Sequence, residues 1–286
     1  MYEDIAALFA KRFVQRRDVK AVQMVVRDKV IYVPDSQMNY PGVHGPLGFR
    51  MDHLTNHIAG LYTYGHYLLD TDDNCRMFCF DIDLKANDDN FTGYYIPMTP
   101  FDPETMTDEI WEAMNAPIPF DPRASWRDRA HASRQWTKMQ FGDLARKLTS
   151  TIVRELDLPC AAAYSGNKGI HVYGFTGPMP ASDVRKAAKY ILESTGDWEL
   201  ERGEHIYRYK VQDPFLGFPN INLELYPKQD TLESKDLGNL LRLPLGKNLK
   251  APDDPTFFLD LNTPVGVMAP HPNPVRLLES GNPFSE

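Results

Sequence analysis

The sequence MFCFDID, residues 77–83, decides the fold of this chain. Its even-numbered residues are apolar, and its last two odd-numbered residues are Asp81 and Asp83. Alternation with a period of two is typical of a β-strand that buries one face. Since side chains i and i+2 of a strand point to the same side, both aspartates lie on the other face. Paired carboxylates suit hard divalent cations, so the strand carries a candidate metal site.

A second motif, SGNKGIH, occupies residues 165–171. Two glycines allow the backbone of a turn to approach a ligand closely, and the turn also carries a hydroxyl, a lysine and an imidazole. Such a set of donors suits the oxyanions of a phosphate group. Together with the carboxylate pair, the motif indicates a metal-dependent enzyme that acts on a nucleotide.

Hydrophobic periodicity divides the rest of the chain into helices and strands. Patterns of helical period predict helices over residues 3–16, 53–61, 105–115 and 136–157, and a helix capped by Ser182 that runs to Glu193. Alternating or apolar runs predict strands over residues 20–26, 29–33, 64–69, 160–164, 170–175, 220–226 and 239–245. This mixture of helices and largely antiparallel strands predicts an α+β fold.

Two regions stand apart by composition. Residues 86–133 form a long insertion rich in proline and aromatic residues, and the end of the chain is also rich in proline. We expect one catalytic domain over residues 1–250 that contains this insertion. Residues 251–286 are predicted to be a tail or linker, which would lead to further domains in a longer protein.

The composition is that of an ordinary globular protein, with 42% hydrophobic and 24% charged residues in a chain of 286. The sequence contains no apolar run of membrane-spanning length, and its acidic opening does not resemble a signal peptide. We therefore expect a cytoplasmic protein that does not bind membranes. Three cysteines are too few for a disulfide framework. Cys75 and Cys79 would make half of a zinc site, but no second pair follows, so buried thiols are the better interpretation.

The formal net charge of −8 is unevenly distributed. An acidic stretch over residues 102–112 is followed by a basic stripe, whose members are Arg123, Arg127, Arg129, Arg134 and Lys138. A local basic stripe is enough to bind a phosphate backbone, even on an acidic protein. The alternative is a solvated surface, which such a stripe forms more often.

Four motifs in a fixed order resemble those of the archaeo-eukaryotic primase superfamily, in particular its phage and mobile-element primase-polymerases. They are DID at 81–83, SGNKGIH at 165–171, LELYPKQ at 223–229 and GNLLRLPLGKN at 238–248. The resemblance implies a catalytic module with an antiparallel sheet core related to the RRM fold and an N-terminal α/β unit. It also implies template-directed nucleotidyl transfer with two divalent cations, Mg²⁺ or Mn²⁺, whereas zinc is not expected.

The resemblance assigns the acidic residues to the metals. Asp81 and Asp83 would bridge the two cations, and Glu224 would complete the triad. The superfamily often has aspartate at this third position, so the glutamate lengthens that arm without removing the carboxylate. The competing interpretation, solvated strand carboxylates, is weaker for the aspartate pair than for Glu224.

The same resemblance assigns the basic and polar residues to the nucleotide. Ser165, Lys168 and His171 match the motif that grips the incoming triphosphate, and Lys228 and Arg242 belong to the third and fourth motifs and would reach phosphate oxygens. Each has a structural alternative. His171 could be a hydrogen-bonded core histidine, Lys168 a solvated lysine at a hairpin tip, and Arg242 a partner of one of the acids.

The expected function is therefore a DNA-templated primase-polymerase of phage or mobile-element replication. Its expected partners are a single-stranded DNA template, a primer strand and NTPs or dNTPs, with a replicative helicase fused to it or acting in trans. Two alternatives stay open: a non-catalytic template-binding module, and another D-x-D enzyme that transfers nucleotide sugars. The sequence leaves open whether the enzyme starts chains or only extends them, and which sugar it prefers.

Overall fold

The computed structural model describes residues 2–38, 47–84, 94–95, 104–114, 118–119, 131–210, 221–232, 237–263 and 268–284. These residues form helices and antiparallel sheets, so the predicted α+β class is confirmed. Within the same ranges, no helix is both long and apolar enough to cross a membrane.

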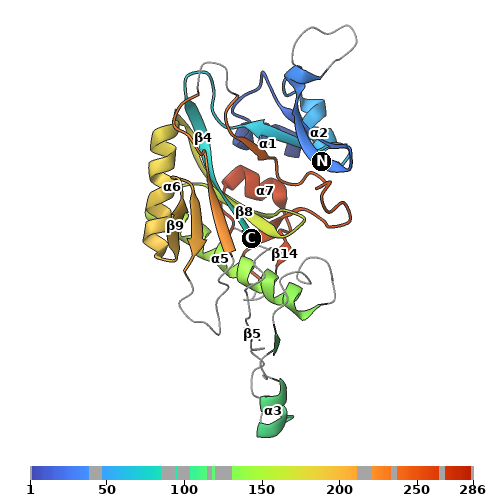
Figure 1. Cartoon of the computed structure of the whole chain (residues 1–286), viewed down its shortest axis with the longest axis vertical. Helices are drawn as coiled ribbons and strands as arrows, with labels where there is room; N and C mark the ends of the chain where they lie inside the picture. The colour runs from blue at the N-terminus through green and yellow to red at the C-terminus, as the bar shows by residue number, and fades with distance from the viewer. Residues whose placement is uncertain are drawn as a thin grey trace.

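The main sheet places the DID strand near its centre (Figure 1). Among the described residues it has eight strands in the order β14-β13-β7-β8-β4-β11-β10-β9, and neighbouring strands run antiparallel. Their bounds are β4 Asn74–Leu84, β7 Cys160–Tyr164, β8 Gly169–Pro180, β9 Trp198–Arg202, β10 Ile206–Tyr209, β11 Ile221–Tyr226, β13 Phe257–Asp260 and β14 Ala269–Pro270. The predicted alternation holds in β4, whose Phe78, Phe80 and Ile82 are fully buried.

Two helices cover one face of this sheet. They are α5 (Ala132–Leu156) and α6 (Ala181–Thr195), which pack against each other and against β8. Phe141, Leu148 and Ile152 of the predicted apolar stripe of α5 are buried in the core. The prediction that Ser182 caps α6 is wrong. Strand β8 runs directly into the helix, so the N-cap position falls on Pro180, and no side chain caps the helix there.

The opposite face is covered by α1 (Tyr2–Phe13) and α7 (Pro274–Ser280), which contact each other, and by a smaller sheet. The rings of Phe9 and Phe13 of α1 pack against Phe258 of β13. Phe13 also contacts Tyr173 and Phe175 of β8 edge-on. One aromatic cluster therefore joins the first helix to the middle and the end of the chain.

The smaller sheet carries the fourth motif. Its order is β12-β3-β1-β2, with bounds β1 Ala21–Val26, β2 Lys29–Pro34, β3 Tyr64–Tyr67 and β12 Leu240–Arg242. A short 3-10 helix, Asp35–Gln37, follows β2, and α2 (Met51–Ile58) precedes β3. Because β12 pairs with β3, the strand after the third motif leaves the main sheet and joins the N-terminal one. The nucleotide motifs therefore meet where the two sheets face each other.

The proline-rich end of the chain differs from the prediction of a tail or linker over residues 251–286. Strand β13 extends the main sheet by pairing with β7, and Leu277 and Leu278 of α7 belong to the core. Strands β9 and β10 of the main sheet were not predicted either. The core thus continues past residue 250 into the last helix.

The predicted insertion contains the short helix expected near 105–115, here α3 (Asp108–Met114). Strands β5 (Tyr94–Tyr95) and β6 (Ile118–Pro119) pair antiparallel and form a separate two-stranded ladder. In Figure 1, α3 lies at the far end of the long axis, away from the main sheet.

Candidate functional site

Strand register brings the acidic and imidazole side chains into one row. Asp81 of β4 lies directly opposite His171 of β8 on one side and opposite Glu224 of β11 on the other. Since cross-strand partners share a face of the sheet, the three side chains project to the same side. The next row on that face contains Asp83, with Gly169 and Asn222 as its partners. Predicted site residues from three separate motifs therefore meet on one surface.

Gly169 makes room for Asp83. A Cβ atom at position 169 would lie 2.1 Å from Oδ1 of Asp83 and 2.3 Å from the carbonyl oxygen of Ile82. Both distances are far below van der Waals contact, so a larger residue would displace the aspartate or the backbone of β4. The second glycine of the SGNKG turn is thus required by its neighbour across the sheet.

His171 joins the acidic pair through a direct contact. Its Nε2 lies 3.2 Å from Oδ1 of Asp81, and its side chain is 7% exposed. Burial works to raise the pKa of Asp81, but the charge and hydrogen bond of His171, helped by Arg242 and Lys228, hold it below the ordinary value. Asp81 therefore stays ionised.

Asp83 has a different environment. Burial and the neighbouring charge of Asp81 raise the pKa of Asp83 to about 6. Lys168 opposes this shift only in part, with its Nζ 3.6 Å from Oδ2 of Asp83 and also donating to the carbonyl oxygen of Leu84. Two carboxylates that repel each other are a place where a cation gains electrostatic energy.

The third carboxylate is held away from the pair. Oε2 of Glu224 accepts hydrogen bonds from Nζ of Lys228 at 2.7 Å and from the hydroxyl of Tyr226 at 3.2 Å. Nζ of Lys228 also lies 4.6 Å from the centre of the Tyr226 ring. In the part of the chain that the structure describes, no three His, Cys, Asp or Glu side chains converge into a complete metal cluster. The carboxylate oxygens are the donors that Mg²⁺ or Mn²⁺ prefers, and Glu224 would have to turn from Lys228 to join the aspartates.

The SGNKG turn is fixed by the fourth motif. The backbone carbonyl of Ser165 accepts hydrogen bonds from Nη2 of Arg242 at 2.6 Å and from Nδ2 of Asn248 at 3.1 Å. Arg242 makes no ion pair with an acid among the described residues, which disagrees with the interpretation of Arg242 as a salt-bridge partner. Asn248 was not predicted, although it ends the GNLLRLPLGKN string. Arg242 positions the turn from strand β12 of the smaller sheet, and Asn248 does so from the segment that follows this strand.

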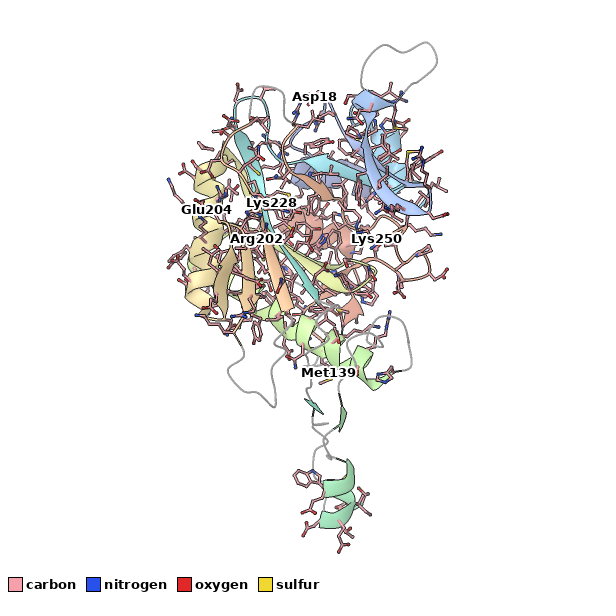
Figure 2. The ribbon with its side chains drawn as sticks, in the orientation of Figure 1. Asp18, Met139, Arg202, Glu204, Lys228 and Lys250 are labelled. Atoms are coloured by element: carbon pink, nitrogen blue, oxygen red, sulfur yellow. The ribbon has the colours of Figure 1, made fainter. Side chains whose placement is uncertain are left out.

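Two hollows flank the aspartates and share Asp81, Asp83 and Lys168. The larger, of about 610 Å³, extends over β10 and β11 and is also lined by Leu84, Glu201, Arg202, Ile206, Asn222 and Glu224. The smaller, of about 260 Å³, lies toward the smaller sheet and is also lined by Gln23, Tyr32, Ser165, Asn167, His171, Tyr226, Leu240, Leu241, Arg242, Asn248 and Lys250. In Figure 2, Arg202 and Lys250 mark the two sides. Neither Arg202 nor Lys250 was predicted from the sequence, because neither belongs to one of the four motifs.

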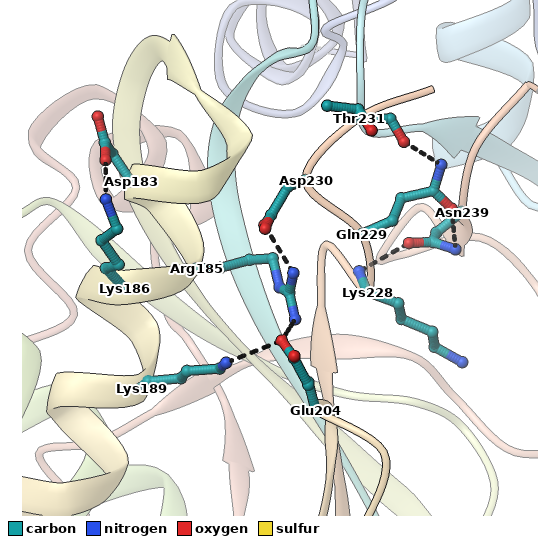
Figure 3. Close-up of polar contacts among 10 residues, drawn as sticks. All are labelled: Asp183, Arg185, Lys186, Lys189, Glu204, Lys228, Gln229, Asp230, Thr231 and Asn239. Atoms are coloured by element: carbon teal, nitrogen blue, oxygen red, sulfur yellow. Dashed lines mark hydrogen bonds and ion pairs between the residues drawn. The ribbon is translucent and has the colours of Figure 1, made fainter. Parts of the chain in front are cut away.

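The connection between β11 and β12 is tied at several points, as Figure 3 shows. The backbone N–H of Lys228 donates to Oδ1 of Asn239 at 2.6 Å, and Nδ2 of Asn239 donates to Oε1 of Gln229 at 3.2 Å. Asp230 accepts a hydrogen bond of 2.6 Å from Arg185 of α6, whose other Nη bonds to Glu204. These contacts fix the backbone from which Lys228 reaches Glu224.

The predicted basic stripe is divided by the structure. Arg123, Arg127 and Arg129 lie outside the described residues. Arg134 is buried, and its Nη2 donates to both carboxylate oxygens of Asp254 at 3.1 Å, so its guanidinium is engaged inside the protein rather than on its surface. Lys138 lies one turn further along α5 and is partly exposed.

The cysteines considered as zinc ligands lie in the core, and so does His57. Cys75, Cys79 and Cys160 are buried free thiols, and burial raises the pKa of Cys75 and of Cys160 to about 12. His57 bridges α2 and the fourth motif, because its Nδ1 accepts from the N–H of Tyr64 and its Nε2 donates to the carbonyl of Pro244. These groups serve the packing of the fold.

Comparison with known proteins gives one result that covers nearly the whole chain. Residues 4–280 match the family described as the TOTE conflict system, Archaeo-Eukaryotic Primase domain. No curated protein matches the chain. The match includes all four motifs as well as β13 and α7, in agreement with a core that extends beyond residue 250. The chain belongs to the archaeo-eukaryotic primase domain family of TOTE conflict systems, a primase-like group of nucleotidyltransferases.

Proposed function

We propose that this chain is a DNA-templated primase-polymerase that adds NTPs or dNTPs to the 3′-hydroxyl of a primer or dinucleotide. The observation that carries the proposal is the row of His171, Asp81 and Glu224 across three strands, with Asp83 beside it and a hollow on each side. A sugar-nucleotide transferase would need the paired aspartates but not the other motifs. Replication of phage or mobile-element DNA is the proposed setting.

Asp81, Asp83 and Glu224 are the residues that would hold two divalent cations. When bound, such cations stabilise the attacking and leaving oxygens of an in-line phosphoryl transfer. The raised pKa of Asp83 supports the assignment, since a cation relieves the repulsion that raises it. Strand register puts Glu224 on the face of Asp81, and Lys228 would release its carboxylate when a cation binds.

The smaller hollow suits the triphosphate. It brings together the SGNKG turn, His171, Arg242 and Lys250 on one side of the aspartate pair. We assign this side to the leaving pyrophosphate, because its donors suit phosphate oxygens. In-line displacement requires attack from the opposite side, so the 3′-hydroxyl of the acceptor enters from the larger hollow. The oxygen of this hydroxyl forms a bond to the α-phosphorus and gives up its proton to solvent, while the bond between the α-phosphorus and the oxygen that bridges to the β-phosphate breaks. Pyrophosphate then leaves with Ser165, Lys168 and His171 as its neighbours.

Primer extension by purified Asp81→Ala and Asp83→Ala variants tests the proposal. We expect both to abolish incorporation with Mg²⁺ or Mn²⁺, because each removes a charge that the cations share. We also expect weaker Mn²⁺ binding, followed by electron paramagnetic resonance, and an unchanged thermal unfolding transition. Asp72→Ala is the matched control, since Asp72 lies in an exposed turn before the same strand.

Robust extension by Asp83→Ala would contradict the two-cation assignment. Wild-type protein that binds the template without incorporating nucleotide would favour the non-catalytic module instead.

A further inference from the structure

Tyr173 is buried directly behind His171. It lies two residues further along β8, on the same face, and is the bulkiest of the fully buried side chains. Its cross-strand neighbours are Cys79 of β4 and Ala161 of β7. Because both neighbours are small, the phenol ring has room on the face of the sheet that α1 covers.

Aromatic packing fixes the orientation of this ring. Phe13 of α1 meets it edge-on with ring centres 5.0 Å apart, and Phe175 stacks on it at 6.3 Å with an interplanar angle of 12°. The ring therefore presents its hydroxyl in one direction, along the strand toward His171.

The hydroxyl completes a chain of hydrogen bonds that ends at the acidic pair. It lies 2.8 Å from Nδ1 of His171, and Nε2 of the same ring lies 3.2 Å from Oδ1 of Asp81. An ionised carboxylate only accepts hydrogen bonds, so Nε2 carries a proton. In the neutral imidazole Nδ1 is then the acceptor and the tyrosine hydroxyl is the donor. Burial raises the pKa of Tyr173 well above its ordinary value, so its proton stays in place.

We propose that Tyr173 is a positioning residue, which holds the imidazole of His171 so that its Nε2–H points at Asp81 and the triphosphate hollow. A hydroxyl suits this role because it donates to a neutral ring and accepts from a charged one. Tyr173 lines neither hollow among the described residues, so it acts through His171. The role in nucleotide binding rests on the proposed function, whereas the orientation of the ring does not.

A double-mutant cycle separates this role from simple packing. Tyr173→Phe keeps the ring and its aromatic contacts and removes only the hydroxyl. We expect it to lower kcat/KM for the incoming nucleotide by about fivefold to tenfold, the size of one neutral hydrogen bond. In a His171→Ala background the same change should have less than about a twofold effect. Equal losses in both backgrounds would show that Tyr173 acts independently of His171 and would overturn the proposal.

A second measurement does not depend on activity. Side-chain ¹⁵N resonances of His171, identified by their loss in His171→Ala, report the hydrogen bond at Nδ1 at a fixed pH. We expect them to shift in Tyr173→Phe and not in Tyr207→Phe, the control, whose ring lies on β10 outside both hollows. Unchanged resonances in Tyr173→Phe would overturn the positioning role. A shift without any wild-type incorporation would keep that role and refute the proposed function.

Discussion

Asp81 and Asp83 lie two residues apart on one strand, but their carboxylates ionise differently. Asp81 has His171 as a direct partner, whereas the nearest cation to Asp83 is Lys168 at 3.6 Å. Their pKa values consequently move in opposite directions, down for Asp81 and up to about 6 for Asp83. Neighbouring carboxylates whose pKa values shift in opposite directions within a hollow are typical of functional sites. Of the two, Asp83 gains more from an approaching cation.

Gly169→Ala tests how closely the site is packed at the level of one residue. We expect loss of nucleotide incorporation and a decrease of about 1–3 kcal/mol in the free energy of unfolding, because the added methyl group collides with Asp83 and the β4 backbone. Primer extension and urea unfolding measure the two effects.

Gly177→Ala near the outer end of β8 is the control for that substitution. Its added Cβ meets nothing within 4 Å, but its φ of 75° is unfavourable for alanine. We expect a stability loss of about 1–2 kcal/mol from this backbone strain and full activity. Full activity in Gly169→Ala would contradict the close packing around Asp83.

At the scale of elements, the sequence predicts the parts whose burial is one-sided. Strand β4 and the adjacent β11 were predicted because apolar residues alternate with Asp81, Asp83 and Glu224, and this alternation also fixed the face on which the acids lie. Four of the five residues of β9 are exposed, so buried and exposed residues do not alternate along this strand and the sequence does not show the period of two. The sheet that Arg242 joins was likewise beyond prediction, because pairing between β12 and β3 depends on contacts distant in the sequence.

Arg134, in the first turn of α5, has a structural role that distinguishes it from the rest of the basic stripe. Arg134 and Asp254 are 6% and 9% exposed in their side chains, so Arg134→Ala removes one half of a buried ion pair. We expect a loss of about 3 kcal/mol in the free energy of unfolding. The dependence of single-stranded DNA binding on salt should stay that of the wild type, as measured below the unfolding transition.

The double variant Arg127→Ala/Arg129→Ala is the matching test of the stripe as a template surface. If these residues contact the phosphate backbone, the slope of log K against log[salt] falls by roughly 0.7 for each lost contact. An unchanged slope would show that these arginines form a solvated surface and do not contact the template. A reduced slope in Arg134→Ala would contradict its structural role.

At the scale of the whole molecule, the first and last elements hold each other. Nε of Arg12 in α1 donates to the carbonyl of Leu278, and its Nη2 donates to that of Glu279, both at 2.8 Å. Arg146 of α5 donates to the backbone of Leu261 and Thr263. A chain cut after residue 250 loses these contacts and the Phe258 ring together.

We therefore expect the fragment of residues 1–250 not to fold cooperatively, as measured by circular dichroism during heating. The fragment of residues 1–284 should unfold like the full chain. A sharp transition in the shorter fragment would support the predicted domain boundary at residue 250 instead.

Two fully buried histidines make the stability of the molecule depend on pH. Burial lowers the pKa of His57 to about 4 and that of His66 to about 3. The unfolded chain binds these protons near pH 6.5, so stability is complete above that value and decreases as the pH falls toward 4. Each histidine contributes up to about 1.4 kcal/mol per pH unit.

Asp83 works in the opposite direction, since its raised pKa lowers stability most above about pH 6, and this loss is relieved as the pH falls toward about 4. Its side chain is 44% exposed, so this effect is the smaller one. We expect urea unfolding at pH 7.5, 6.5 and 5.5 to show decreasing stability, with a steeper decrease in Asp83→Asn. Constant stability over this range would contradict the neutral, buried state of the histidines.

During synthesis of the chain, β7 leaves the ribosome long before β13, its partner at that edge of the main sheet. Until then the backbone N–H and C=O groups along that edge of β7 have no strand to bond with, and an unpaired edge of this kind recruits strands of other molecules. The nascent protein is therefore most prone to aggregation between the emergence of β7 and that of β13. Chaperones that hold the growing chain should raise the yield of native protein most when they act in this interval.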